Sequence, residues 1–132
     1  MTDSLLGEIV QDALQAVTFN RSGLVLDFGD AWFTAHAWPT VRVGGSTYAL
    51  GDRGYRDALC ALITHEVTAV DEVPGKGLIL TFGLGSITTN PEPADLSGPE
   101  VAQLAIYDAM NQVRHLAVWR AGEAPFVGPA WS

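Results

Sequence analysis

The sequence predicts an α+β fold, mainly an antiparallel β-sheet with two amphipathic helices and a pseudo-twofold internal repeat. The repeat can be read directly, because residues 23–34 and residues 77–88 share six of twelve residues at an offset of 54. In both copies leucine and phenylalanine alternate with other residues, which is the period of a strand with one buried face. Each copy also follows a segment whose apolar residues recur at helical spacing.

The two helices are expected just before the two copies. Ser4 can cap the first helix by accepting hydrogen bonds from free N–H groups of the first turn. Its apolar face falls at i, i+3, i+4, i+7 and i+11, namely Leu6, Ile9, Val10, Ala13 and Val17. Asp52 is placed to cap the second helix, whose apolar stripe is Tyr55, Leu59, Leu62 and Ile63. Val17-Thr18 and Val67-Thr68 are expected to open equivalent strands after these helices.

The first copy is expected to form a strand with Leu24, Leu26 and Phe28 facing the core. A return strand over residues 31–38 then turns Phe33 inward, since its counterpart in the second copy is Ile87. Trp32, whose counterpart is Ser86, is assigned to the opposite face. Gly44-Gly45 between two short apolar runs predicts a tight hairpin turn.

The predicted organisation is one α+β domain over residues 1–121, with helix-plus-hairpin repeats at about 4–50 and 52–89, a closing C-terminal hairpin, and a Gly/Pro-rich tail over residues 122–132. Two points stay open. Residues 100–119 alternate as a hairpin would, which is the favoured prediction, but they also carry a poorer helical stripe. Phe126 and Trp131 of the tail either pack on the body or are mobile.

Composition narrows the class of protein. Fifteen acidic and seven basic side chains give a net charge of −8, which disfavours nucleic acid and anionic membrane as partners and favours a basic protein. The start has no signal-peptide pattern and no apolar run approaches membrane-spanning length, so a soluble, cytoplasmic protein is expected. Cys60 is the only cysteine, which excludes an intramolecular disulfide.

No motif predicts catalysis, a cofactor or a metal site. His65-Glu66 lacks a second histidine one helical turn later, because residue 69 is alanine. Residues 83–86 are rich in glycine but lack the lysine and following helix of a phosphate-binding loop. We therefore assign no catalytic residue and favour a protein that is not an enzyme, although a hydrolytic function stays open as an alternative.

The candidate binding residues follow the return strand. Trp32, Thr34, His36 and Trp38 alternate along it, and Asp27 of the neighbouring strand is expected on the same face. Tryptophans beside a histidine and a carboxylate could form a recognition patch. The alternative is that a helix covers this face and that the tryptophans are ordinary core residues, because an uncovered double-tryptophan patch promotes aggregation.

Four stretches carry a resemblance: residues 24–30, residues 57–62 leading into Val67, residues 77–82 and residues 116–119. Together they resemble a family of small uncharacterised bacterial proteins, mostly actinobacterial, classed as a domain of unknown function. This chain departs from the family pattern at residues 100–102 and lacks a glycine pair before the final strand. The resemblance implies a β-rich α+β fold and no catalytic or binding residue.

Three functions are consistent with these observations. The first is a non-enzymatic acidic protein-binding domain, in its most specific form a bacterial immunity or antitoxin-like protein that occludes a basic toxin. The second is a small-molecule binding or hydrolytic domain with a pocket between the repeats and with His36 and Asp27 as an acid–base pair. The third is a self-assembling structural subunit.

Overall fold

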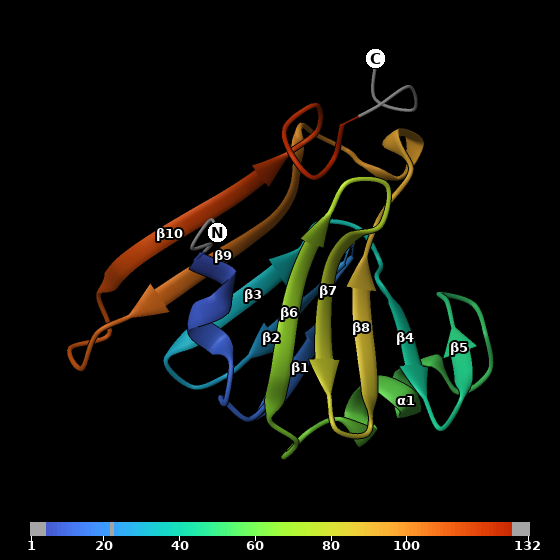
Figure 1. Ribbon diagram of the computed structural model, residues 1–132, viewed down its shortest axis with the longest axis horizontal. Helices are drawn as coiled ribbons and strands as arrows, with labels where there is room; N and C mark the ends of the chain where they lie inside the picture. The colour runs from blue at the N-terminus through green and yellow to red at the C-terminus, as the bar shows by residue number, and fades with distance from the viewer. Residues whose placement is uncertain (1–4, 22, 128–132) are drawn as a thin grey trace.

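Two five-stranded antiparallel sheets make up most of the computed structural model, which describes residues 5–21 and 23–127 (Figure 1). The first sheet has the order β1 (Ala16–Phe19), β2 (Leu24–Asp27), β3 (Ala31–Ala35), β9 (Glu100–Tyr107) and β10 (Val113–Arg120). The second has the order β5 (Ser46–Tyr48), β4 (Thr40–Val43), β8 (Gly85–Thr89), β7 (Gly77–Phe82) and β6 (Val67–Val73). The antiparallel sheet is therefore the dominant structure.

The prediction of an α+β fold with two amphipathic helices is wrong. In the described part of the chain there is one α-helix, α1 (Tyr55–Ala61), and two short 3₁₀ helices, η1 (Leu5–Ile9) and η2 (Pro93–Asp95). The first helix stops early because Gln11 has φ 78°, which a right-handed helix does not allow. Val17, the last residue of the predicted stripe, lies in β1.

The second helix is shorter than predicted and begins differently. Asp52 does not cap it; its carboxylate accepts the Ala49 N–H at 2.8 Å and closes a turn before the helix. Gly54, at φ 90°, precedes the first helical residue without a side-chain cap. The apolar stripe is confirmed in part: Tyr55 and Leu59 are buried in α1 and Leu62 is buried just after it, whereas Ile63 lies beyond the helix and is only partly buried.

The internal repeat is present in the strand register. Leu24 pairs with Ala35 and Leu26 with Phe33, and 54 residues later Leu78 pairs with Thr89 and Leu80 with Ile87. A methyl group added at Gly23 would lie 2.0 Å from the Ala35 carbonyl oxygen, and one added at Gly77 would lie 2.1 Å from that of Thr89. Glycine is therefore required at both equivalent positions by the same close approach.

The segments before β1 and β6 pair with each other. Ala13 and Glu66 form an antiparallel bridge. The Leu14 N–H donates to the His65 carbonyl and, 53 residues on, the Val67 N–H donates to the Asp12 carbonyl, both at 3.0 Å. Left-handed backbone occurs in both copies, at Gln11 and Thr64. These segments thus match at an offset of 53, so the predicted equivalence of Val17-Thr18 with Val67-Thr68 is wrong: Val17 corresponds to Val70.

The hairpins that follow the two copies are exchanged between the sheets. The hairpin β4–β5 comes after β3 but pairs with β8, and the hairpin β9–β10 comes after β8 but pairs with β3. Gly44 and Gly45, at φ 62° and 85°, form the predicted turn of β4–β5. Residues 100–119 are the predicted hairpin and not a helix.

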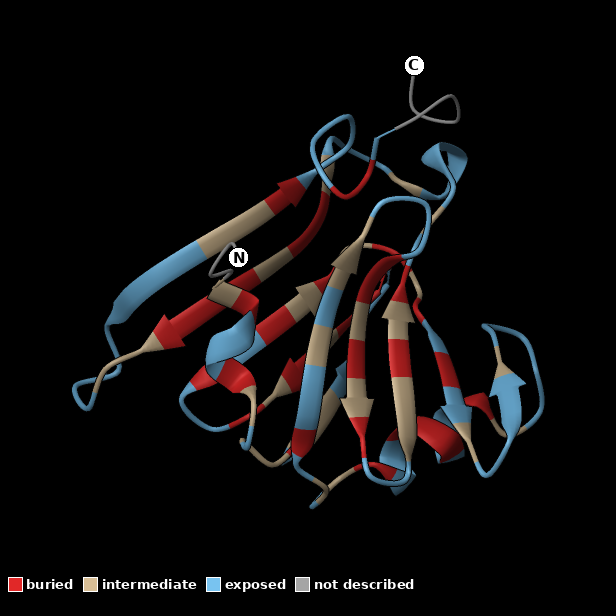
Figure 2. Ribbon diagram, in the orientation of Figure 1, coloured by how far each residue is buried: buried red, intermediate tan, exposed pale blue. Residues whose placement is uncertain are grey.

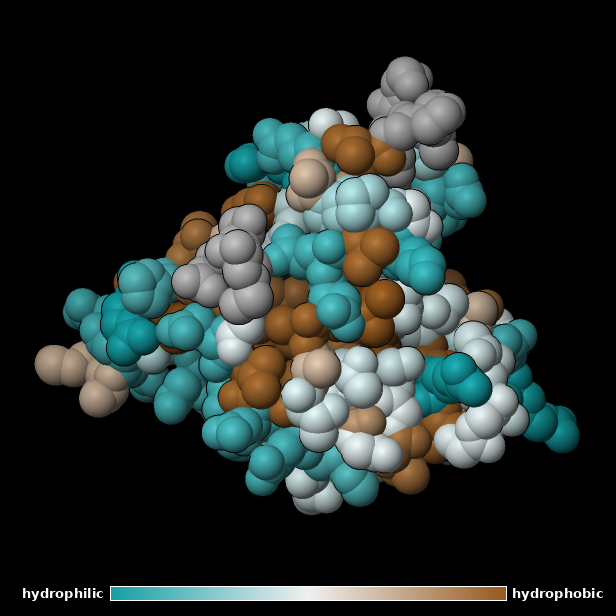
Figure 3. All heavy atoms as spheres, viewed as in Figure 1, coloured by the Kyte–Doolittle hydropathy of each residue, from teal (hydrophilic) through white to brown (hydrophobic). Residues whose placement is uncertain are grey.

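The core lies between the sheets, where the buried residues meet (Figure 2). It contains the repeated leucines and phenylalanines at no more than 3% exposure, as predicted: Leu24, Leu26, Phe28, Leu78, Leu80 and Phe82. Phe126 of the tail belongs to the same cluster, whereas Trp131 lies outside the described residues. On the face drawn in Figure 3, hydrophobic residues gather near the centre and hydrophilic residues surround them. None of the helices in the described residues is long and apolar enough to span a bilayer.

Candidate binding site

The outer face of the first sheet carries three of the five predicted site residues. Its alternation places Phe33 in the core at 1% exposure and leaves Trp32 45% exposed. Asp27 pairs with Trp32, and Thr34 lies next along the same face. The cross-strand row continues from Trp32 to Ala105 and from Ala105 to Leu116, which is 55% exposed.

Neither of the helices α1 and η1 covers this face. The helix α1 contacts β4 and β1, and η1 contacts β10 and β6, so both lie at the ends or edges of the two layers (Figure 1). Trp32 and Leu116 are both exposed on this face, and Ala105, which lies between them, is buried at 3% exposure. The alternative, in which a helix covers this face and the tryptophans belong to the core, therefore fails for Trp32 but holds in part for Trp38, which packs against the core and Tyr55 of α1.

The other two predicted residues lie elsewhere. The strand β3 ends at Ala35, and Trp38 turns to the inner side, where its ring stacks at 6.5 Å from Phe19 and meets Tyr55 edge-on at 6.3 Å. His36 is beyond the strand end, with Nε2 buried, without a hydrogen bond, and 3.6 Å from a carboxylate oxygen of Glu100. Pro39 and the crossing to β4 bend the chain here, so the predicted four-residue row is cut after Thr34.

Asp27 and His36 therefore do not meet. Asp27 pairs with Trp32 at the turn end of the hairpin, whereas His36 follows Ala35, the partner of Leu24 at the opposite end. Four strand residues separate these ends, or about 13 Å. A proton cannot pass directly between the two side chains, so Asp27 and His36 are too far apart to act as the proposed acid–base pair.

A pocket of about 490 Å³ opens at the turn end of the first sheet. It is lined by residues from the β1–β2–β3 meander and from the β9–β10 hairpin: Gln15, Asp27, Gly29, Trp32, Tyr107 and Asn111. Trp32 and Tyr107 meet edge to face, with ring centroids 5.8 Å apart. One oxygen of Asp27 accepts the Gly29 N–H at 2.7 Å, which fixes the carboxylate at the rim.

Acidic side chains gather beside this pocket. Asp30 follows the lining residue Gly29, and its backbone carbonyl accepts the Tyr107 N–H at 2.7 Å. Burial, and then the charges of Asp30 and Glu8, raise the pKa of Asp12 above its ordinary value. Glu8 has a long ion pair of 3.9 Å with Arg114. Among the described residues that line the pocket, none is basic.

Sequence reasoning did not find Tyr107, Gln15 or Asn111. The hairpin prediction places Ile106 on the inner face, so Tyr107 could have been assigned to the outer one. The missing step was the pairing of β9 with β3, which brings Tyr107 to Trp32 across 75 positions in sequence. The exchange of hairpins leaves no local signal in the sequence.

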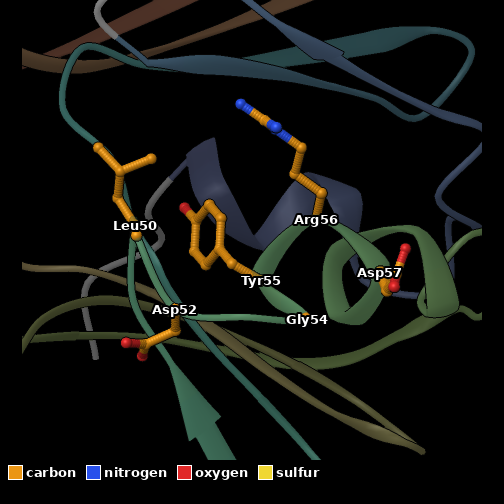
Figure 4. Close-up of a pocket in the computed structure, with 7 residues that line it drawn as sticks. Leu50, Asp52, Gly54, Tyr55, Arg56 and Asp57 are labelled. Atoms are coloured by element: carbon orange, nitrogen blue, oxygen red, sulfur yellow. The ribbon is translucent and has the colours of Figure 1, made fainter.

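A second pocket, of about 480 Å³, lies between the β5–α1 connection and α1 (Figure 4). Burial raises the pKa of Tyr55 to about 12, and its hydroxyl donates to the Pro39 carbonyl. Asp52 and Asp57 point away from Tyr55 in Figure 4, in different directions. Because its polar groups do not converge, this pocket offers no evident chemistry.

No group of three or more histidine, cysteine, aspartate or glutamate side chains is placed to hold a metal ion in the described part of the chain. Comparison with known proteins gave no match to a family model, to a curated protein or to a solved structure. The resemblance to the actinobacterial domain family stays a prediction.

Proposed function

We propose that this protein is a binding domain that docks a basic protein partner on the outer face of the first sheet. The observation that supports it is the row formed by Asp27, Trp32, Ala105 and Leu116, which combines an exposed tryptophan, an exposed leucine and a carboxylate. Tryptophan is a favoured anchor at protein interfaces.

The second sheet supports the proposal by contrast. At the same register, its outer row consists of Thr81, Ser86, Arg42 and Thr47. This row is polar and carries a positive charge. Since the repeated backbone accepts polar residues at these positions, folding does not require Trp32 and Leu116 on the first sheet.

Charge complementarity supports a basic partner as the occupant of this face. The chain has a net charge of −8, and Asp30, in the β2–β3 turn at the end of the docking face, is close enough to Asp12 for its charge to raise the pKa of that carboxyl. A basic partner would be attracted over a Debye length of about 8 Å at physiological salt, which raises the association rate more than the affinity. In its most specific form the partner is a toxin and the domain an immunity protein, acting in the cytoplasm as the sequence predicts.

The test begins with partners captured at low salt, identified and prepared in pure form. Their affinity is then measured for the wild type, for Leu116→Thr and for Leu84→Thr. Thr is the residue that the second sheet has at the equivalent position, and Leu84 is an exposed leucine, 41% accessible, on the β7–β8 turn of the second sheet. We expect Leu116→Thr to weaken a basic partner about fivefold to tenfold and Leu84→Thr to leave it unchanged.

Three results would contradict the proposal. An acidic partner would exclude the proposed charge class. A partner that binds Leu116→Thr and Leu84→Thr equally well would exclude this face as the docking site. A dimer that forms with rising protein concentration and is lost in Leu116→Thr makes a second copy the occupant, as in the self-assembly hypothesis; analytical ultracentrifugation measures it.

A further inference from the structure

We infer that the pocket formed by Asp27, Trp32 and Tyr107 binds the cationic end of a lysine or arginine side chain of the partner. This inference rests on the proposed function and makes it more specific. It assigns the two rings as the walls that contact the cation and the carboxylate as its counter-charge.

The aromatic geometry fits a cation. The two rings meet edge to face at an interplanar angle of 66°, so they are not stacked on each other. Trp32 is 45% exposed, which leaves its ring accessible. An ammonium or guanidinium within about 6 Å of such a ring is attracted by its negative face. The protein already contains this contact, with the Arg56 guanidinium 5.8 Å from the Phe19 centroid.

The electrostatics select a cation over a neutral group. Asp27 uses one carboxylate oxygen to fix the turn at Gly29, and its other oxygen has no hydrogen-bond partner in residues 5–21 and 23–127. A protonated amine or a guanidinium supplies the charge-assisted donors that this oxygen can accept. Asp30 and Asp12 add negative charge nearby, and the described lining residues include no lysine or arginine.

The size of the pocket fits one long side chain. A volume of about 490 Å³ is within the range of small-ligand sites. Gln15 and Asn111 at the rim offer amide groups for hydrogen bonds to a peptide backbone, and the open row toward Leu116 offers apolar contact for the rest of the partner. Pocket and row thus form one continuous surface with its cationic anchor at the turn end.

The test titrates acetylated, amidated hexalysine into the protein and measures binding by NMR, from the backbone amide signals in every variant and from the Trp32 indole N–H signal in those that retain this residue. The variants are Trp32→Ser, which installs the residue of the second sheet, and Asp27→Asn, which keeps an oxygen for the Gly29 N–H. Asp71→Asn on the exposed side of β6 is the control that removes the same charge elsewhere. We expect a saturable shift of the Trp32 signal, and about tenfold weaker binding in the two pocket variants but not in the control.

Three results would overturn the inference. If Asp27→Asn and Asp71→Asn weaken hexalysine binding equally, the peptide is held by the overall negative charge and not by the pocket. The proposed basic partner would still stand, because the Leu116→Thr comparison tests it separately. No shift of the Trp32 signal at millimolar peptide excludes the pocket in the folded wild type, whatever the variants do. Binding of putrescine as tight as that of hexalysine makes the ligand a free amine and not a side chain of a partner.

Discussion

The hairpins β2–β3 and β7–β8 are alike toward the core and different toward solvent. Their inner positions carry Leu24, Leu26 and Phe33 in one copy and Leu78, Leu80 and Ile87 in the other, all nearly inaccessible. Their outer positions carry Asp27 and Trp32 in one and Thr81 and Ser86 in the other. The shared set fixes strand register, because a shift by one residue would expose every buried side chain. The differing set is free to serve binding.

The strands added to each hairpin enlarge this difference. The hairpin β9–β10 has two strands of eight residues, whereas β4 and β5 have four and three. The longer strands bring Tyr107 beside Trp32, where the second sheet has Gly44 beyond the end of β4. The pocket lined by Trp32 and Tyr107 is therefore a property of one copy only.

The first prediction tests whether the inner faces are equivalent. Leu26→Ala and Leu80→Ala should each lower the free energy of unfolding by about 2–5 kcal/mol, since both side chains are at most 1% exposed in the same core. Urea denaturation measures both values. A loss confined to one variant would break the comparison.

The second prediction tests the glycines that begin both copies. Gly23→Ala should cost about 1–3 kcal/mol because the new methyl group would meet the Ala35 carbonyl. Gly77→Ala should cost about 1 kcal/mol more, because its backbone has φ +84° as well as the same clash with Thr89.

Gly75→Ala is the control for the second prediction. Gly75 has φ +83° with nothing within 4 Å of an added methyl group, so it isolates the backbone effect. Thermal unfolding of the three variants should show the smallest loss of stability for Gly75→Ala. If Gly75→Ala were as damaging as Gly77→Ala, the close approach would contribute nothing.

The third prediction concerns a contact that ties the longer hairpin to the other sheet. The Trp119 indole N–H donates to the Glu72 carboxylate at 2.8 Å, joining β10 to β6. Glu72→Ala should lower the free energy of unfolding by about 1 kcal/mol, and Glu72→Gln, which retains an oxygen acceptor, by less. Equal losses in urea denaturation would mean that the side-chain stem, and not the hydrogen bond, is stabilising.

The fourth prediction has the smallest expected effect and concerns Asp12, whose counterpart in the second copy is His65. Because the pKa of Asp12 is raised in the folded protein, the fold binds the proton more tightly than the unfolded chain does. The charged form therefore destabilises the fold above the raised pKa. Because Asp12 is only partly buried and solvent screens its charge, Asp12→Asn should add no more than about 0.5 kcal/mol at pH 7. That gain should vanish below the ordinary value of 3.8, where both states are protonated. Urea midpoints across this pH range test it, and a gain that grows on acidification would contradict it.

The buried core and part of the candidate site could be predicted from the sequence. Alternation at residues 24–28 and 78–82 predicted the buried faces, and the mismatch of Trp32 with Ser86 placed Trp32 outside. Helical spacing at residues 6–17 led to the wrong prediction of an α-helix. Leu6 and Ile9 fit a short 3₁₀ helix equally well, and the chain after them pairs with residues 64–67. His36 and Trp38 were misplaced because alternation was extended past the true end of β3.

The exchanged hairpins set an order for assembly during synthesis. All five strands of the second sheet have been made once residue 89 has left the ribosome, whereas β3 must wait for β9, whose residues pair with it across some 70 positions. Such distant pairing is slow to form because it closes a long loop. The surface that carries Trp32 is therefore the last of the two sheet faces to be completed, so the proposed docking face is absent from the newly made chain until β9 and β10 have emerged.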